Sequence, residues 1–330
     1  MGTFDNRYVA IKKESAYGTP SGSYKFGEVD DESIRHQYDI LTREDMSRYG
    51  AAKSVTGKEY SSGDINMAML NDDFTGNLIM GIMGTDTVGS ISSGLYPHTF
   101  TEAGTLASYT LLVSREDKEH LYKGQVVDSM SVSASLNEYA TVGFSMMGRS
   151  EDIGSLAAAG TTSPTFPDAL PALYFSNAKV FFNADSTATS LVKSISFDIN
   201  LNRDDENACA LGSTTYTVAP PPQRREISGT IEFNKVVHSA VESEPTYTQL
   251  TTADGLELSG SGIELKVQFG DDTTADLLTF NFYKIRFEAA DANVSGRDTN
   301  TMSVNFVALY SPDDNKMMDI VMKNTTSGAY

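Results

Sequence analysis

Several side chains that could perform catalysis occur in this sequence, but their spacing does not form a catalytic motif. A serine nucleophile at a strand-to-helix elbow needs a glycine two residues before it and another two residues after it. The stretch Gly89–Gly94 (GSISSG) does not have this spacing. A phosphate-binding loop needs a glycine directly before its lysine, and Gly50–Ser54 (GAAKS) has alanine there. The sequence therefore predicts neither a nucleophile elbow nor a P-loop NTPase.

The residues that could bind a metal ion are dispersed along the chain. Neither HExxH nor an i, i+4 pair occurs among the four histidines, which are His36, His98, His120 and His238. We expect each histidine to lie at the surface or at a sheet edge. Acidic residues cluster beside predicted turns, at Asp30–Glu32, Asp204–Glu206, Asp271–Asp272 and Asp313–Asp314. None of these clusters has the spacing of a calcium-binding loop, so the sequence predicts no metal site and no cofactor, with adventitious cation binding as the alternative.

An enzyme that needs only two carboxylates is harder to exclude. A glycosidase uses two acidic side chains that face one cleft, and the chain holds 44 acidic residues, so a carbohydrate-active enzyme stays an alternative. The single cysteine, Cys209, excludes an intrachain disulfide. We expect surfaces rather than pockets to carry the function, and we predict that the protein is not an enzyme.

The composition is that of a folded and strongly acidic protein. The chain has 330 residues, about twice the usual domain length, so two domains or one doubled domain is expected. Its 44 acidic and 25 basic residues give a formal net charge of −19. Because binding to phosphates needs clustered Lys and Arg, this charge balance argues against binding of nucleic acid. It permits a protein surface that repels DNA. Neither a signal peptide nor an apolar run of roughly 20 residues is visible, which predicts a soluble product made in a cytoplasm, with no membrane partner.

The elements that must position these residues are mainly strands. Apolar residues alternate with polar ones along most of the chain, as in half-buried antiparallel strands. The predicted strands are 106–113, 126–136, 140–146, 191–201, 227–233, 263–269, 277–287 and 302–310. In the predicted strand 126–136, serines alternate with Val132, Ala134 and Leu136. We expect the apolar face of this strand to pack on a core and the serine face to contact water or a partner strand.

Helical patterns are scarce. Phe74, Leu78 and Ile82 form one stripe behind a capping Asp72 or Asp73, which predicts a short helix within 71–83. A weaker helical pattern occurs at 246–252. We therefore predict an all-β fold with one or two short helices.

The predicted elements occur twice in the same order. A strand, a glycine-containing strand, a helix and further strands follow one another in each half, with Gly57 and Gly229 in matching places. Glycine-flanked alternating strands are also common in β-proteins without duplication, so that alternative stays open. We predict an N-terminal extended arm, a first β-sandwich, a linker or crossover with a hairpin, a second β-sandwich and a C-terminal tail, at 1–33, 34–150, 151–190, 191–323 and 324–330 respectively.

Several stretches together resemble the major tail tube proteins of long-tailed, siphovirus-like bacteriophages. They are YVAIKKESAYGTP at 8–20, the glycine-spaced segment 53–84, YPHTF at 96–100, SYTLLV at 108–113, LYKGQVVDSMSVSASL at 121–136 and REISGTIEF at 225–233. The resemblance implies a β-sandwich flanked by a helix, whose inner sheets join between subunits into a β-barrel that lines a tube. It also implies that rings stack through an N-terminal arm at Tyr8–Asp31 and through loops at 39–53 and 85–95. The arm would anchor in the neighbouring ring through Tyr8, Ile11, Tyr17 and Tyr24.

The same resemblance implies a structural virion protein of the tail, assembled in the host cytoplasm, through which viral DNA passes during ejection. Its partners would be copies of itself, a tape-measure protein and tail-end proteins. Tube rings present six sandwich domains, so a duplicated chain predicts a trimeric ring with pseudo-sixfold symmetry, which we favour; an outward decoration domain would instead predict a hexamer. An acidic lumen would let DNA pass without specific binding. Another virion β-protein, from the baseplate or for receptor binding, is the structural alternative.

Overall fold

The protein is an antiparallel β-structure with short helices, which confirms the predicted all-β class. We describe residues 7–330 of a computed structural model, except positions 45, 48, 51–52, 93, 156–165, 167–171, 184, 241–242, 252–262, 271–276 and 289–299. The first half contains β1 (Tyr8–Ala16), β2 (Thr19–Pro20), β3 (Lys25–Gly27), β4 (Asp31–Glu32), β5 (Arg35–Arg43), β6 (Lys53–Ala68), α1 (Asp73–Met83), β7 (Gly84–Val88), β8 (Tyr96–Glu102), β9 (Tyr109–Arg115), β10 (Lys118–Ser135), β11 (Thr141–Gly148) and β12 (Ser150–Ser155).

The second half begins with a 3₁₀ turn and continues with strands and one short helix. These elements are η2 (Phe175–Asn177), β13 (Ala178–Phe182), β14 (Val192–Asn200), β15 (Glu226–Phe233), α2 (Tyr247–Thr251), β16 (Ile263–Gly270), β17 (Leu277–Phe287), β18 (Met302–Ala308) and β19 (Met318–Asn324). Both predicted helices are therefore present, and the eight predicted strands all overlap observed ones.

The two halves share one topology. In the first half, β1 pairs with β9, β9 with β10, β10 with β11 and β12, β11 with β6, and β6 with β5. In the second half, β13 pairs with β16, β16 with β17, β17 with β18 and β19, β18 with β15, and β15 with β14. Helix α1 follows β6 as α2 follows β15. The matching strands span Tyr8–Ser155 and Ala178–Asn324. The first unit therefore begins four strands before the boundary predicted at 34, and the second begins one strand before the boundary predicted at 191.

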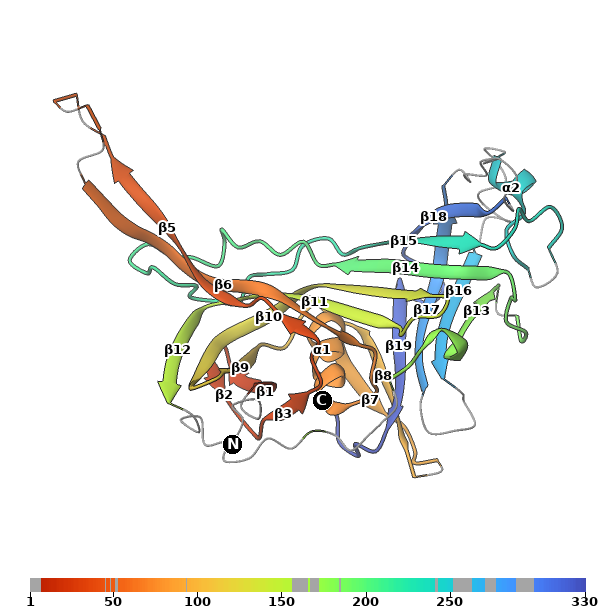
Figure 1. Ribbon diagram of the computed structural model, residues 1–330, viewed down its shortest axis with the longest axis horizontal. Helices are drawn as coiled ribbons and strands as arrows, with labels where there is room; N and C mark the ends of the chain where they lie inside the picture. The colour runs from red at the N-terminus through yellow and green to blue at the C-terminus, as the bar shows by residue number, and fades with distance from the viewer. Residues whose placement is uncertain are drawn as a thin grey trace.

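The halves are joined edge to edge into one large sheet. Strand β10 pairs with β14, with Ser131 opposite Asp198, and β8 pairs with β19. The sheet therefore runs through β5, β6, β11, β10, β14, β15 and β18 (Figure 1). It does not close on itself, because no strand in the described part of the chain pairs with the outer edge of β5.

The core lies on one side of this sheet. In the second half, the sheet folds over so that Phe197 on β14 contacts Phe280 and Phe282 on β17, with ring centroids 5.0 and 5.2 Å apart. In the first half, α1 packs between the large sheet and the strands β1 and β3, and most of its residues are buried. The N-terminus of α1 is capped by Asp72, whose Oδ1 accepts the Thr75 N–H at 2.8 Å. The predicted helix and its aspartate cap are thus confirmed.

The N-terminal segment differs from the extended arm that we predicted. Residues Tyr8–Ala16 form β1, which pairs with β9 inside the same chain. Val9 and Ile11 join the main core, while Tyr8 and Ala10 pack in a second small cluster on the other face. Because both faces of β1 are covered, the strand has no polar alternation that the sequence could reveal.

The C-terminal segment is also not a free polar tail. The Tyr330 side chain is buried, and its hydroxyl group hydrogen-bonds with Asp73 and Asn324. Its ring lies over His98, with centroids 4.9 Å apart. This aromatic contact explains why a polar stretch folds back onto the body.

Candidate functional site: the polar face and the projecting hairpin

The face of the large sheet opposite the core is lined by hydroxyl, amide and carboxylate groups. One register row across β6, β11, β10, β14 and β15 consists of Asn66, Gly143, Ser131, Asp198 and Ser228. Apart from Gly229, which is half-buried, their neighbours along the strands point the other way and are buried in the core, as alternation along a strand requires. We call this surface the polar face. The predicted hydroxyl-lined side of 131–136 lies on it.

Acidic groups outnumber basic groups on the polar face. Asp64, Asp198 and Glu226 are exposed there, and Glu232 is half-buried beside them. The Lys193 ammonium pairs with Glu232 at 2.8 Å. At the β5 edge, Arg35 lies opposite Ser62 and adds a second positive charge. The polar face is therefore a hydroxyl-rich surface with a net negative charge.

A long hairpin continues the sheet beyond its neighbours. Strand β6 pairs with β11 only from Ser61 onward, whereas Lys53–Tyr60 pair with β5, and Glu59 also bridges to Thr215. These two strands project from the body in Figure 1. Their exposed side chains are unusually apolar and include Tyr38, Ile40, Leu41 and Val55, each more than half exposed, with Met46 and Tyr49 fully exposed near the tip. A set of this kind marks an interaction surface.

The loop between β14 and β15 braces the base of this hairpin. The Lys58 ammonium lies 2.5 Å from the Asp205 carboxylate, and the Glu59 N–H donates to the Thr214 carbonyl at 2.7 Å. The rings of Tyr60 and Tyr216 stack with centroids 6.2 Å apart. The hairpin base is therefore held by the second half of the chain.

Comparison with known families fits this architecture. A family model described as phage tail tube protein matches residues 5–308. The chain belongs to the phage tail tube protein family. The match extends over both halves, and the predicted resemblance is confirmed. The family is structural rather than enzymatic and places the chain in the virion tail. No curated protein was found to match the chain.

In this tail tube protein, the four predicted arm anchors pack against their own chain. Ile11 is fully buried in the core, and the Tyr8 hydroxyl donates to Glu119 at 2.5 Å. Burial raises the pKa of Tyr17 well above its usual value, and burial together with Glu119 raises the pKa of Tyr24 to about 12. These tyrosines therefore stay neutral at physiological pH. A role for the four residues in joining rings stays a prediction.

The two segments predicted to join tail tube rings have different structures. Residues 39–53 contain the outer part of the projecting hairpin. Residues 85–95 contain most of β7 and a short turn closed by a bridge between Ser92 and Leu95, with position 93 outside the described residues. The first segment projects far from the body, and the turn between β7 and β8 forms a shorter protrusion (Figure 1). Joining of rings by either segment stays a prediction.

One histidine lies in the interior, where the sequence predicted a surface or edge position. His98 is fully buried, with Nδ1 2.8 Å from Asp86 and Nε2 2.8 Å from the Thr326 carbonyl oxygen. His120 Nδ1 lies 2.6 Å from Glu151. Among the described residues, no group of three or more His, Cys, Asp or Glu side chains could hold a metal ion. His98 and His120 are therefore structural hydrogen-bonding residues.

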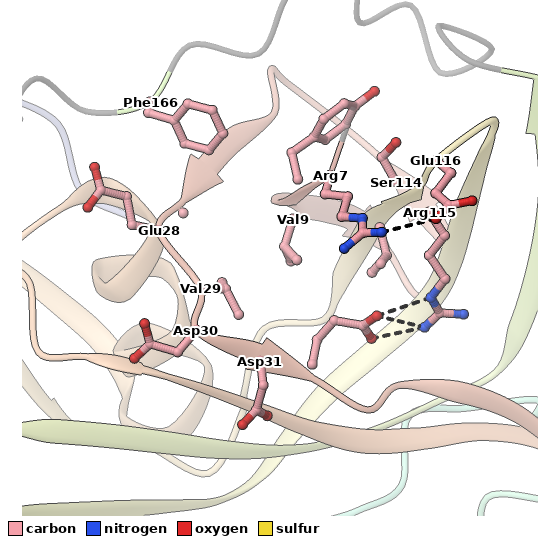
Figure 2. A pocket seen from close by; sticks show the side chains of 14 residues that line it. Arg7, Val9, Glu28, Val29, Asp30, Asp31, Ser114, Arg115, Glu116 and Phe166 are labelled. Carbon is pink, nitrogen blue, oxygen red and sulfur yellow. Dashed lines mark hydrogen bonds and ion pairs between the residues drawn. The ribbon is translucent and has the colours of Figure 1, made fainter. Parts of the chain in front are cut away.

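A pocket of about 610 Å³ lies beside β1 and the β3–β4 connection. Figure 2 shows its lining, where the Arg115 guanidinium binds the Glu32 carboxylate at 2.9 Å. The carboxylates of Glu28, Asp30 and Asp31 point in different directions rather than toward one another (Figure 2). A glycosidase pair would face a common point, so this pocket does not favour the carbohydrate-active alternative. In the described part of the chain, no helix is long and apolar enough to span a bilayer.

Proposed function

We propose that this chain assembles into rings and that the rings stack into the hollow tail tube through which viral DNA passes during ejection. The family match supports a tail tube component. The observation that carries the proposal is the position of β5, the first strand of the large sheet, whose outer edge is unpaired in the described chain. An unpaired edge with exposed apolar side chains is a template for strand pairing with another chain.

The repeat suggests which strand covers that edge. Strand β14 of the second half corresponds to β5 of the first half, and β14 is paired with β10. The counterpart of β10 in the second half is β17. If neighbouring chains repeat the contact that joins the two halves, β5 of one chain lies beside β17 of the next. Such a heterologous contact closes into a ring when the rotation between neighbouring chains completes a circle, and we propose that it does so here.

The same argument favours three chains per ring. Each chain supplies two sandwich units of one topology, so three chains supply the six units expected of a tail tube ring. Ring closure would give a trimer with pseudo-sixfold symmetry. A hexamer would instead use only one unit of each chain around the lumen and leave the other outside.

The polar face supports a lumen that does not hold DNA. If the large sheets join around the ring, Asp64, Asp198 and Glu226 face the central channel and repel the phosphates of passing DNA. Screening limits this repulsion to about 8 to 10 Å at physiological salt, so only acids on the polar face contribute. A tape-measure protein within the tube and tail-end proteins at its termini are the further partners that we propose, with assembly in the host cytoplasm.

Electron microscopy and native mass measurement test this function. Purified chains at rising concentration are expected to form rings of three copies and then hollow striated tubes. A chain with Ile40→Lys and Leu41→Lys places charges on the β5 edge and is expected to stay monomeric, because lysines on an edge strand disfavour pairing with another strand. A wild-type chain that stays monomeric at every concentration would contradict the proposal.

A further inference from the structure

Two exposed apolar sites lie at opposite ends of the large sheet. One is the hairpin tip, with Met46 and Tyr49. The other follows β10, where Leu136 is 53% exposed and Tyr139 is 63% exposed. Strand β6 connects the two ends, because it begins at the hairpin and its last residue, Ala68, pairs with Thr141 directly after this turn. We call the second site, formed by Leu136, Tyr139 and Tyr174, the turn patch.

The turn patch is preorganised by backbone contacts. Tyr139 and Tyr174 form a β-bridge, and the Phe175 N–H donates to the Glu138 carbonyl at 3.0 Å. The rings of Tyr174 and Phe175 meet edge to face, with centroids 5.9 Å apart. A shallow cavity of about 70 Å³ adjoins them and is lined in part by Leu136 and Phe175. A rigid apolar surface with a cavity can accept a protruding side chain at little entropic cost.

The hairpin is long enough, and its tip is apolar enough, to pack on such a surface of another copy. Strand β6 extends past β11 from Tyr60 to Lys53, which spans roughly 26 Å at about 3.3 Å per residue. The methionine side chain at its tip is flexible and adapts to irregular apolar surfaces, and tyrosine adds area with few rotatable bonds. When identical rings stack by translation, one end of each chain meets the opposite end of another.

We infer that the hairpin tip of one chain, through Met46 and Tyr49, packs on the turn patch of a second copy in the adjacent ring. This inference rests on the proposed ring assembly and names the surface that receives the hairpin. The contact is heterologous, so each chain uses its tip on one side and its turn patch on the other. When this contact repeats along the tube, hairpin tips and turn patches stay uncovered only at the two ends of the tube.

Disulfide trapping tests this pairing directly. In a Cys209→Ser background, Met46→Cys combined with Tyr139→Cys is expected to give, after mild oxidation of assembled tubes, a ladder of covalent multimers on denaturing gels. Each chain then carries two different linking positions, so the ladder extends beyond dimers. Chains with Met46→Cys alone or Tyr139→Cys alone cannot extend beyond dimers. Tubes that form normally and yet give no ladder would overturn the inference.

Removal of the turn patch gives a second test. Leu136→Ser with Tyr139→Ser is expected to leave the ring mass unchanged and to reduce tube formation at least tenfold. Tyr310→Ser is the matched control, because Tyr310 is 54% exposed in a turn away from both sites, and it is expected to form tubes normally. Normal tubes from the patch variant would overturn the axial contact and leave ring formation intact, whereas wild-type chains that never form rings would overturn the proposed function itself.

Discussion

Arg225 donates a hydrogen bond from Nη2 to the carbonyl oxygen of Ile82 at 2.8 Å, although 143 positions separate the two residues. Nη1 of the same side chain lies 3.2 Å from the Glu102 carboxylate. Ile82 is in the last turn of α1, where carbonyl groups lack helical partners. A cation from the second half therefore completes the end of a helix in the first half, where the helix dipole favours positive charge.

Replacement of Arg225 is expected to destabilise the whole chain. The Arg225 side chain is only 12% exposed, so Arg225→Ala leaves the Glu102 carboxylate and the Ile82 carbonyl group without their partner in a buried site. We expect a loss of about 3 kcal/mol in the free energy of unfolding, measured by urea titration. Arg224→Ala is the control, because Arg224 is exposed, and it is expected to change stability by less than about 0.5 kcal/mol. Equal effects from both variants would contradict this role of Arg225.

Asp72 is expected to make stability depend on pH. Burial raises the pKa of its carboxyl group from 3.8 to about 6. Because the folded chain binds this proton more tightly than the unfolded chain, the charged group costs stability above pH 6, and the cost disappears as the pH falls toward 3.8. Asp72→Asn keeps an oxygen for the helix cap and removes the charge. We expect a gain of about 2 to 3 kcal/mol at pH 8 that shrinks to near zero at pH 4, by urea unfolding. A gain that is constant across this range would show that the charge is not its source.

Asp73 is expected to give a pH dependence of the opposite sign. Burial opposes its ionisation, but hydrogen bonds from Lys25 and Thr326 outweigh burial and lower the pKa of the Asp73 carboxyl group. A carboxylate with a lowered pKa stabilises the fold above its unfolded pKa, and this contribution is lost as the pH falls through its folded pKa. Asp73→Asn should therefore cost about 1.5 kcal/mol at pH 7 and progressively less in acid, in the same urea titrations. An Asp73→Asn variant that is as stable as the wild type at pH 7 would contradict the lowered pKa.

The sequence predicts elements that are covered on one face only. Strand β17 has the predicted bounds, because Phe280 and Phe282 face the core while Asn281 and Tyr283 are less buried. Strand β1 could not be predicted from its sequence pattern. Ala10 and Ile11 are adjacent, their side chains point to opposite faces of the strand, and both are fully buried. Alternation is visible only where one face of a strand meets water.

Contacts that depend on long-range folding are not visible in residue spacing. His98 reaches the carbonyl oxygen of Thr326, 228 positions away, and no local pattern marks either residue. The serine alternation predicted a polar side for 131–136, but the register that aligns Ser131 with Asp198 depends on pairing between the two halves. The hydroxyl groups of the candidate site could therefore be predicted, and its carboxylates could not.

Gly76 is expected to tolerate no side chain, because of the folded-back C-terminal segment. A Cβ atom at this position would lie 2.3 Å from Cζ of Tyr330, well inside van der Waals contact. Alanine favours a helix over glycine by up to about 1 kcal/mol, but displacement of the Tyr330 ring costs more. We expect Gly76→Ala to lose about 1 to 2 kcal/mol and to increase hydrogen exchange in 325–330. Gly104→Ala, at an open position, should change neither measurement; protection of 325–330 in Gly76→Ala as strong as in wild type would contradict the clash.

The charge of the polar face can be reversed without a change in the edges that assemble the tube. Asp198→Lys with Glu226→Lys replaces two exposed carboxylates by ammonium groups that attract phosphates. We expect the variant tubes to retain duplex DNA in co-sedimentation at about 0.05 M salt and to release it at about 0.5 M, whereas wild-type tubes retain none. Asp117→Lys with Asp313→Lys makes the same change in net charge at exposed turns outside the polar face. Comparison of the two variants therefore separates the effect of charge on the polar face from the effect of total charge. If the turn variant retained as much DNA as the polar-face variant, the total charge, and not the surface formed by β14 and β15, would govern passage of the genome.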